Sequence, residues 1–259
     1  MLQKVMSRMR KAITDYGMIK DGDKIAVGVS GGKDSQLVLI ALKEMQRYLP
    51  VKFELMGITV ALGFESFDIK SLLDFYNNLG VDYHIEDTQI SKIVFDTRKE
   101  KNPCSLCANM KRGAIYSAAK ALGCNKMAFG HHMDDVIETL LMSLLYEGRI
   151  HTFSPVTYLD RKDITLIRPL IYTDEKMVKA CVKALGIQPI KSGCPADGVT
   201  KRQEVKELIG TLMKTNKTLK ANLFGAIQRA GINGWKPEGT THTAREILSG
   251  LTQIPNLDT

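Results

Sequence analysis

Short apolar runs alternate with stretches of helical periodicity along most of the chain. The predicted strands occupy the apolar runs at residues 24–30, 51–60, 81–87, 126–130 and 163–170. The predicted helices follow them at residues 33–48, 66–79, 110–122, 134–146 and 174–185. Strands that alternate with helices are typical of right-handed crossovers and of a parallel sheet covered on both faces. The pattern therefore predicts the α/β class, with a doubly wound, mainly parallel sheet.

The two ends of the chain depart from this repeat. The first segment has an amphipathic helix whose apolar positions share one face, at Val5, Met9, Ile13 and Tyr16. From residue 201 the pattern becomes helical and basic, and residues 233–259, with the single Trp, resemble a loosely ordered tail. We expect an N-terminal helix over 1–22, an α/β domain over 23–200, and a small basic helical extension with its tail over 201–259.

Composition and charge narrow the class of protein only slightly. Of the 259 residues 44% are hydrophobic and 25% charged, as in ordinary soluble globular proteins. The sequence has no apolar run of the about 18 residues that a membrane span needs, and its N-terminus lacks the apolar core of a signal peptide. We therefore expect a cytoplasmic protein without a membrane partner. The net charge of +8 suits a polyanion such as nucleic acid, and suits a basic soluble enzyme equally well.

A short loop with two glycines follows the first predicted strand. Its residues are Ser30, Gly31, Gly32, Lys33, Asp34 and Ser35, which do not match the Walker A pattern. Successive amides around two glycines form an anion-binding nest, to which the next helix adds the partial positive charge of its N-terminus. A carboxylate beside phosphates needs a cation, so Asp34 indicates Mg²⁺. The loop is predicted to bind a phosphorylated ligand at the carboxyl edge of the sheet, the alternative being a serine-capped turn.

A second polar stretch, GHHMDD at residues 130–135, follows the fourth predicted strand and opens a helix. In a parallel sheet it lies at the same edge as the first loop. Its two acids could instead be a helix cap and a first-turn charge without catalytic meaning. We interpret Glu138 and Thr139 as helix body, and His84 and His151 as structural.

The five cysteines fall into two groups. Cys124 lies within or just past a predicted helix and Cys181 lies inside one, and at apolar helical positions cysteine is usually a small buried hydrophobe. Cys104 and Cys107 form a CxxC before a helix, and Cys194 lies in a later loop, so all three are expected in loops. From the residues alone, the trio could hold a [4Fe–4S] cluster with one open iron, pass a persulfide, or bind zinc.

The order of these motifs resembles that of the PP-loop, or N-type, ATPases. SGGKDS is similar to their pyrophosphate-binding loop, and GHHMDDVIETLLMSLL to the GHxxDD segment of their tRNA-modifying members. The segments PCSLCANMKRGAIYSAAKALGCNKMAFGHHMDDVIETLL and TLIRPLIYTDEKMVKACVKALGI resemble the tRNA 2-thiocytidine synthetase branch of the tRNA thiolases. The resemblance spans roughly residues 20 to 200.

The resemblance implies an adenine nucleotide alpha hydrolase-like fold and an AMP-forming tRNA sulfurtransferase. In such enzymes ATP is cleaved between the α- and β-phosphates, a nucleobase carbonyl oxygen is adenylated, and sulfur then replaces that oxygen. The implied cofactors are ATP, Mg²⁺ at Asp34 and a [4Fe–4S] cluster on Cys104, Cys107 and Cys194. The implied partners are tRNA, a sulfur donor (a cysteine desulfurase or free sulfide) and a second copy of the chain in a homodimer.

The resemblance also implies roles for individual residues. The catalytic set is Asp34, Lys111, Cys104, Cys107 and Cys194. The ATP-binding set includes all residues of the first loop. It also includes Ile58, Thr59 and Val60, which would bind adenine, Gly130 and His131, which would lie near the α-phosphate, and Asp135. The RNA-binding set is Lys111, Arg112, Lys201 and Arg202, for which the alternative is a solvated helix face.

The sequence departs from the family pattern at its third cysteine. Cys194 stands alone in SGCP, where 2-thiocytidine synthetases carry a CxxC-like segment, so the target base stays open. Two other functions compete. A ligase of the lysidine synthetase type would use the same adenylation but needs no cysteine trio, and a non-catalytic metal- or nucleotide-binding regulator would not need Asp34, Lys111 and Asp135.

Overall fold

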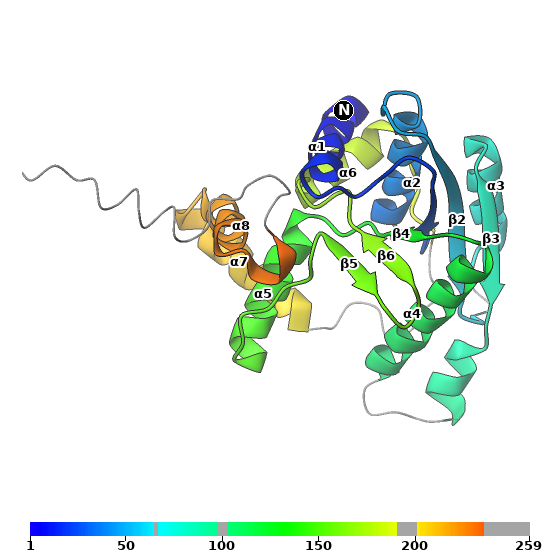
Figure 1. Cartoon of the computed structure of the whole chain (residues 1–259). Helices are drawn as coiled ribbons and strands as arrows, with labels where there is room; N and C mark the ends of the chain where they lie inside the picture. Colours follow the sequence, from blue (N-terminus) through cyan, green and yellow to red (C-terminus); the bar gives the residue numbers. More distant parts are fainter. Residues whose placement is uncertain (65–66, 98–102, 191–200, 236–259) are drawn as a thin grey trace, which may run out of the picture.

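A six-stranded sheet with the strand order β3-β2-β1-β4-β6-β5 forms the centre of the molecule (Figure 1). The computed structural model describes residues 1–64, 67–97, 103–190 and 201–235. The strands are β1 (Asp23–Gly28), β2 (Phe53–Ala61), β3 (Asp82–Asp87), β4 (Lys126–Ala128), β5 (Val156–Leu159) and β6 (Ile164–Ile167). All pairings are parallel except that of β5 with β6. The predicted α/β class with a mainly parallel sheet is confirmed.

Helices cover both faces of this sheet (Figure 1). They are α1 (Leu2–Asp15), α2 (Lys33–Met45), α3 (Ile69–Leu79), α4 (Pro103–Ala121), α5 (Met133–Glu147), α6 (Glu175–Ala184), α7 (Lys201–Thr215) and α8 (Leu219–Ala230). One apolar core joins the inner sides of α1, α2, α5 and α6 to the sheet. A second core joins α4 and the π-helical segment η1 (Lys92–Thr97) to the other face. Helices α7 and α8 pack against α5 at the side of the sheet.

The order of the strands brings the ends of β1 and β4 together. These two strands are direct neighbours in the centre of the sheet and run in the same direction. In such a sheet the loops that follow neighbouring strands meet at the carboxyl edge, where helix N-termini point at a ligand. The two motifs recognised in the sequence follow these two strands.

Two elements differ from the sequence-based prediction. Helix α4 begins at Pro103, so Cys104 and Cys107 lie in its first turns, and the expectation that they lie in a loop is wrong. Proline is accepted in the first turn of a helix because its missing N–H has no partner there in any case. The strand β5 was not predicted, because it is a four-residue edge strand with only partial burial.

The sequence predicted a loosely ordered tail from residue 233, but the described part of that segment, up to Trp235, packs against the folded core. Trp235 follows the short 3₁₀ helix η2 (Ile232–Gly234) and is fully buried. Its ring packs edge-on against Tyr16 and Phe224, and its Nε1 donates a hydrogen bond to the Phe153 carbonyl at 3.0 Å. In the parts of the chain that the structure describes, none of the helices combines the length and apolarity that crossing a membrane requires.

Candidate active site

The phosphate loop, residues 30–35, joins β1 to α2 and is held in shape by its own hydrogen bonds. Ser35 donates from Oγ to the Gly32 carbonyl at 2.9 Å, and Gln36 donates from Nε2 to the Gly31 carbonyl at 2.7 Å. Gly31 has a φ of +83°, the left-handed region that favours glycine. Because the N-cap of α2 is Gly32, no side chain caps the first turn of this helix. Its amide groups are therefore suited to bind an anion.

The histidine-aspartate loop, residues 130–135, lies directly against the phosphate loop. A Cβ atom on Gly130 would come within 2.8 Å of the Asp34 carbonyl carbon and 3.0 Å of the Ser35 nitrogen. Only glycine allows this close backbone approach. In the same loop, the Asp135 carboxylate accepts a hydrogen bond from the His132 backbone N–H at 2.9 Å and closes the N-terminus of α5.

The two loops and α4 together enclose a cavity of about 290 Å³. Nine of the predicted site residues line it: Ser30, Gly32, Asp34, Ser35, Val60, Lys111, Gly130, His131 and Asp135. The remaining lining residues are Gly28, Val29, Ile115 and Phe129. Gly31 and Lys33 belong to the same loop, and Lys33 donates from Nζ to both carboxylate oxygens of Asp34, at 2.9 and 2.8 Å. Segments that lie far apart in the sequence therefore meet at one cavity.

The end of β2 contributes to the cavity through Val60. Ile58 is fully buried in the core, and its carbonyl accepts a hydrogen bond from the Val29 N–H at 2.9 Å. Thr59 is also buried, donates from Oγ1 to the Val29 carbonyl at 2.7 Å, and lies 2.9 Å from the Tyr76 hydroxyl. The adenine-binding role predicted for Ile58 and Thr59 stays a prediction. Through these bonds the Ile58 carbonyl and the Thr59 side chain hold Val29, the residue that precedes the loop.

One face of α4 runs from the cavity toward the CxxC pair. Lys111 and Ile115 are four residues apart and both line the cavity. Cys107 precedes Lys111 by four residues and Cys104 precedes Cys107 by three, spacings that keep side chains on one helical face. Cys104 is exposed and Cys107 is partly buried. Two thiols at this spacing beside a cavity fit the chemistry of a thiolate-bound cluster.

The third predicted ligand, Cys194, lies outside the described residues. Within the described ranges, no group of three or more His, Cys, Asp or Glu side chains could hold a metal ion. The other two cysteines behave as expected. Cys124 and Cys181 are buried, and burial raises the pKa of each thiol.

His131 lines the cavity between two aromatic rings. Its ring centroid lies 5.8 Å from that of Phe129 and 4.9 Å from that of Phe153. Burial, aided by the positive charge of Arg168, lowers the pKa of His131 to about 4. His131 is therefore neutral at pH 7. Its buried Nδ1 atom has no hydrogen-bond partner within the described part of the chain, which suits a side chain that faces a ligand.

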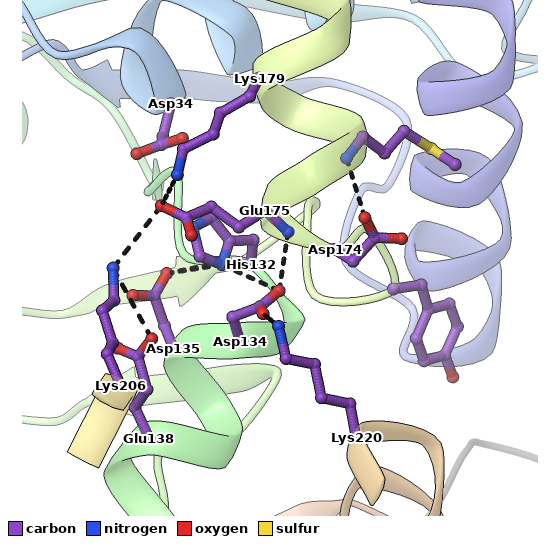
Figure 2. Close-up of polar contacts among 12 residues, drawn as sticks. Asp34, His132, Asp134, Asp135, Glu138, Asp174, Glu175, Lys179, Lys206 and Lys220 are labelled. Carbon is purple, nitrogen blue, oxygen red and sulfur yellow. Dashed lines mark hydrogen bonds and ion pairs between the residues drawn. The ribbon is translucent and has the colours of Figure 1, made fainter. Parts of the chain in front are cut away.

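An α5–α7 ion-pair cluster, formed by Asp135, Glu138, Arg202 and Lys206, reaches the cavity through Asp135. Figure 2 shows three of its members, Asp135, Glu138 and Lys206. Arg202 lies 3.1 Å from Asp135 Oδ1 and 3.2 Å from Glu138 Oε2, both measured from Nη1. Lys206 Nζ lies 3.7 Å from Glu138 Oε1. Burial raises the pKa of Glu138 to about 7, and Lys206 opposes part of that rise. Arg202, predicted to bind RNA, thus points toward two carboxylates.

The cluster continues to the phosphate loop through Glu175 of α6. Glu175 Oε1 lies 3.5 Å from Lys206 Nζ and 3.9 Å from Lys33 Nζ. Its backbone N–H donates to Asp134 at 2.7 Å, and Asp134 also binds Lys220 of α8 (Figure 2).

Sequence reasoning interpreted Glu138 as helix body and did not single out Glu175. The three-residue spacing of Asp135 and Glu138 was the available signal, because it puts two carboxylates on one helical face.

The remaining RNA-binding candidates lie at the surface. Arg112 is exposed on α4, where it hydrogen-bonds to Asn109 of the preceding turn. Lys201 has 64% of its side chain exposed and pairs with Glu204 on the same helix at 3.3 Å. Lys111 instead faces the cavity. Their predicted contacts with RNA stay predictions.

Comparison with known proteins agrees with the geometry of the cavity. Residues 1–209 match the family model of the PP-loop domain. The chain is 36% identical to the tRNA-cytidine(32) 2-sulfurtransferase of Geobacter sulfurreducens over 87% of this chain and 89% of the relative. It is also 36% identical to that of Citrifermentans bemidjiense, over 98% and 96%.

Solved structures give the same result at the level of the fold. The U34-tRNA thiolase NcsA from Methanococcus maripaludis, solved with its [4Fe-4S] cluster, superposes with a TM-score of 0.72 and 26% identity over 88% of this chain and 78% of that chain. The NH3-dependent NAD synthetase of Campylobacter jejuni shares the fold at a TM-score of 0.50 and 17% identity, over 88% and 92%. The chain belongs to the PP-loop family and, within it, to the tRNA-cytidine(32) 2-sulfurtransferases.

Proposed function

We propose that this protein thiolates a cytidine of tRNA in two steps, adenylation of the base and replacement of its oxygen by sulfur. One observation carries the proposal. The phosphate loop, the histidine-aspartate loop and α4 share one cavity, and α4 carries Lys111 in that cavity and Cys107 one helical turn away. The relatives named tRNA-cytidine(32) 2-sulfurtransferase favour the 2-carbonyl oxygen as the group replaced.

In the first step the carbonyl oxygen of the base attacks the α-phosphorus of ATP, and pyrophosphate leaves. The phosphate loop would hold the departing pyrophosphate through the amides at the start of α2 and the two serine hydroxyls. Lys33 and Lys111 would offset the charge that builds up on the phosphates. His131, neutral at pH 7, would lie against the α-phosphate without adding charge.

Magnesium is expected beside Asp34, and Asp135 lines the same cavity from the opposite loop. Carboxylates and phosphate oxygens are the ligands that Mg²⁺ prefers in proteins. In this arrangement Asp34 would exchange its contact with Lys33 for the cation, and Lys33 would turn to the phosphates.

In the second step a sulfur nucleophile attacks the carbon that carries the adenylate, and AMP leaves with the original oxygen. The balanced reaction consumes cytidine, ATP and sulfide and releases 2-thiocytidine, AMP and pyrophosphate, so no oxidant is needed. A [4Fe–4S] cluster held by three thiolates would supply an open iron that carries the sulfur. The residues of this chain that would hold it are Cys104, Cys107 and Cys194.

Chain connectivity supports Cys194 as the third ligand. Ile190 donates from its backbone N–H to the Gly31 carbonyl at 2.8 Å, which ties the chain to the phosphate loop. Cys194 follows four residues later, and four residues span at most about 14 Å. This short separation in the sequence supports the proposal that Cys194 is the third ligand.

The tRNA would approach over exposed basic residues, among them Arg112 on α4 and Lys201 on α7. The sulfur donor is free sulfide, or a cysteine desulfurase whose persulfide sulfur is first reduced to sulfide by a thiol reductant, and a homodimer in the cytoplasm is the expected form. The CxxC pair beside Lys111 distinguishes this function from that of a lysidine-type ligase, which would attack the adenylate with an amine.

The test is anaerobic reconstitution with iron and sulfide, followed by incubation with unmodified tRNA, ATP, Mg²⁺ and sulfide. We expect a brown protein, and 2-thiocytidine in the nucleoside digest by mass spectrometry. Cys104→Ala and Cys194→Ala should lose iron and product, whereas Cys181→Ala, which removes a buried thiol elsewhere, should keep both. Full iron retention by Cys194→Ala, or a colourless protein with stoichiometric zinc that still makes product, would contradict the cluster assignment.

A further inference from the structure

We propose that Arg202 is a positioning residue for the nucleotide site: it holds the Asp135 carboxylate at the cavity and is itself anchored by buried Glu138. The inference rests on the proposed function only in that the cavity binds ATP with Mg²⁺. It assigns to Arg202 a role in the nucleotide site, where the sequence predicted a contact with tRNA.

The contacts of Arg202 tie three residues of α5 to one guanidinium. Its Nη1 atom donates to Asp135 Oδ1 at 3.1 Å and to Glu138 Oε2 at 3.2 Å, and its Nη2 atom donates to Thr139 Oγ1 at 3.4 Å. A planar guanidinium can serve several acceptors at once, whereas the ammonium of a lysine is a single point charge on a flexible stem. The geometry therefore calls for arginine at this position.

Asp135 is the member of this group that faces the ligand. It lines the cavity, one of its oxygens accepts the His132 N–H, and the other accepts Arg202. Both of its oxygens are therefore held from outside the cavity. A carboxylate fixed in this way keeps a constant position toward a cation or a phosphate, which is how groups behind a metal site usually act.

Glu138 explains why Arg202 stays in place. Its side chain is 2% exposed, so its charge needs a partner, and that partner comes from α7. Lys206, one turn after Arg202, approaches the second Glu138 oxygen at 3.7 Å. Arg202 and Lys206 thus hold α7 against α5 next to the cavity. Val205, which lies between them in the sequence, is buried.

Lys201, the residue before Arg202 on α7, differs from Arg202 in both its exposure and its partner. Lys201 has 64% of its side chain exposed and Arg202 has 39%, and Lys201 pairs within its own helix. Of these two adjacent basic residues, Lys201 is the one available to a tRNA phosphate. The two positions therefore form a matched pair for an experiment.

The experiment compares Arg202→Met, Arg202→Lys and the control Lys201→Met in the full chain. ATP binding is measured by calorimetry as a function of Mg²⁺ concentration, and tRNA binding is measured separately. Arg202→Met should weaken Mg²⁺-dependent ATP binding about tenfold, with tRNA binding near the wild-type level. Arg202→Lys should restore part of the loss. Lys201→Met should leave ATP binding unchanged.

Glu138→Gln keeps the shape of the anchor and tests the proposal even if Arg202→Met fails to fold. It should weaken Mg²⁺-dependent ATP binding in the same direction as Arg202→Met, by a smaller factor. If Arg202→Met and Glu138→Gln bind ATP like the wild type, the inference is overturned. It is equally overturned if Arg202→Met loses tRNA binding alone. A wild-type protein that binds no ATP would instead overturn the proposed function as well.

Discussion

The phosphate loop and the α5–α7 ion-pair cluster border the same cavity but are built in different ways. The phosphate loop consists of backbone amides, two glycines, two serines and the adjacent Lys33–Asp34 pair, between one strand and one helix. The cluster consists of charged side chains from helices that are far apart in the sequence. The first depends on close backbone approach and the second on burial of charge. They should therefore fail under different perturbations, the loop under added volume and the cluster under a change of charge.

The largest effect is expected from added volume between the two loops. Gly130→Ala would place a methyl group within 2.8 Å of the Asp34 backbone, so the loops must move apart. Because small displacements of reacting groups are costly, we expect about a hundredfold loss of ATP–pyrophosphate exchange.

The matched control is Gly113→Ala in α4, where, among the described residues and apart from the backbone of its own helix, no atom lies within 4 Å of the added Cβ. This change should leave exchange intact and raise stability slightly, because alanine favours the helix over glycine. Equal exchange rates in Gly130→Ala and the wild type would show that the contact between the loops is not needed.

The second prediction concerns the charge of the cluster. The pKa of Glu138 is about 7 in the folded protein and 4.5 in its ordinary state, so between these values the folded state binds more protons than the unfolded state. The contribution of Glu138 to stability therefore declines as pH rises from about 4.5 to 7, by about 3 kcal/mol. Urea unfolding of the wild type and Glu138→Gln at several pH values measures this difference. Parallel stability curves for the two proteins would rule out a raised pKa.

The smallest effect is expected from removing the positive charge of Arg168 near His131. The response of His131 to acid is opposite to that of Glu138. Its pKa of about 4 lies below the ordinary 6.5, so stability is lost as pH falls between these values. Burial is the largest cause of the lowered pKa of His131. Among the neighbouring charges, Arg168, Arg202 and His132 lower this pKa further, and Asp135 raises it. Arg168→Met should therefore raise the pKa of His131, but not to its ordinary value of 6.5, because burial still lowers it. NMR titration of the imidazole ring measures this change.

Arg149→Met is the control for the His131 measurement. Arg149 is exposed and pairs with Glu147, so its removal should leave the titration of His131 unchanged. The same shift in both variants would mean that Arg168 has no particular influence on His131.

The difference between the two regions also explains what could be predicted. The phosphate loop is local, because six consecutive residues after an apolar strand contain its glycines, hydroxyls and acid. The histidine-aspartate loop is local in the same way. The fold class followed from alternating strands and helices, and nine of the predicted site residues line the cavity.

The cluster could not be predicted in this way, because charged residues at helical spacing look like a solvated face in any sequence. Arg202 was assigned to RNA for this reason, and Glu138 to the body of a helix. The domain boundaries and the contacts with RNA stay predictions, as does the role of Cys194, which lies outside the described residues.

The alternation of strands and helices, the family and the two loops at the edge of the sheet could all be inferred from residue order, because they depend on neighbours in the chain. Three other features required the folded structure: Arg202 faces Asp135 and Glu138, Trp235 closes the core against Tyr16, and the CxxC pair lies within α4. The physical reason is that burial and ion pairing depend on which surfaces meet. That meeting is set by the packing of whole helices against the sheet.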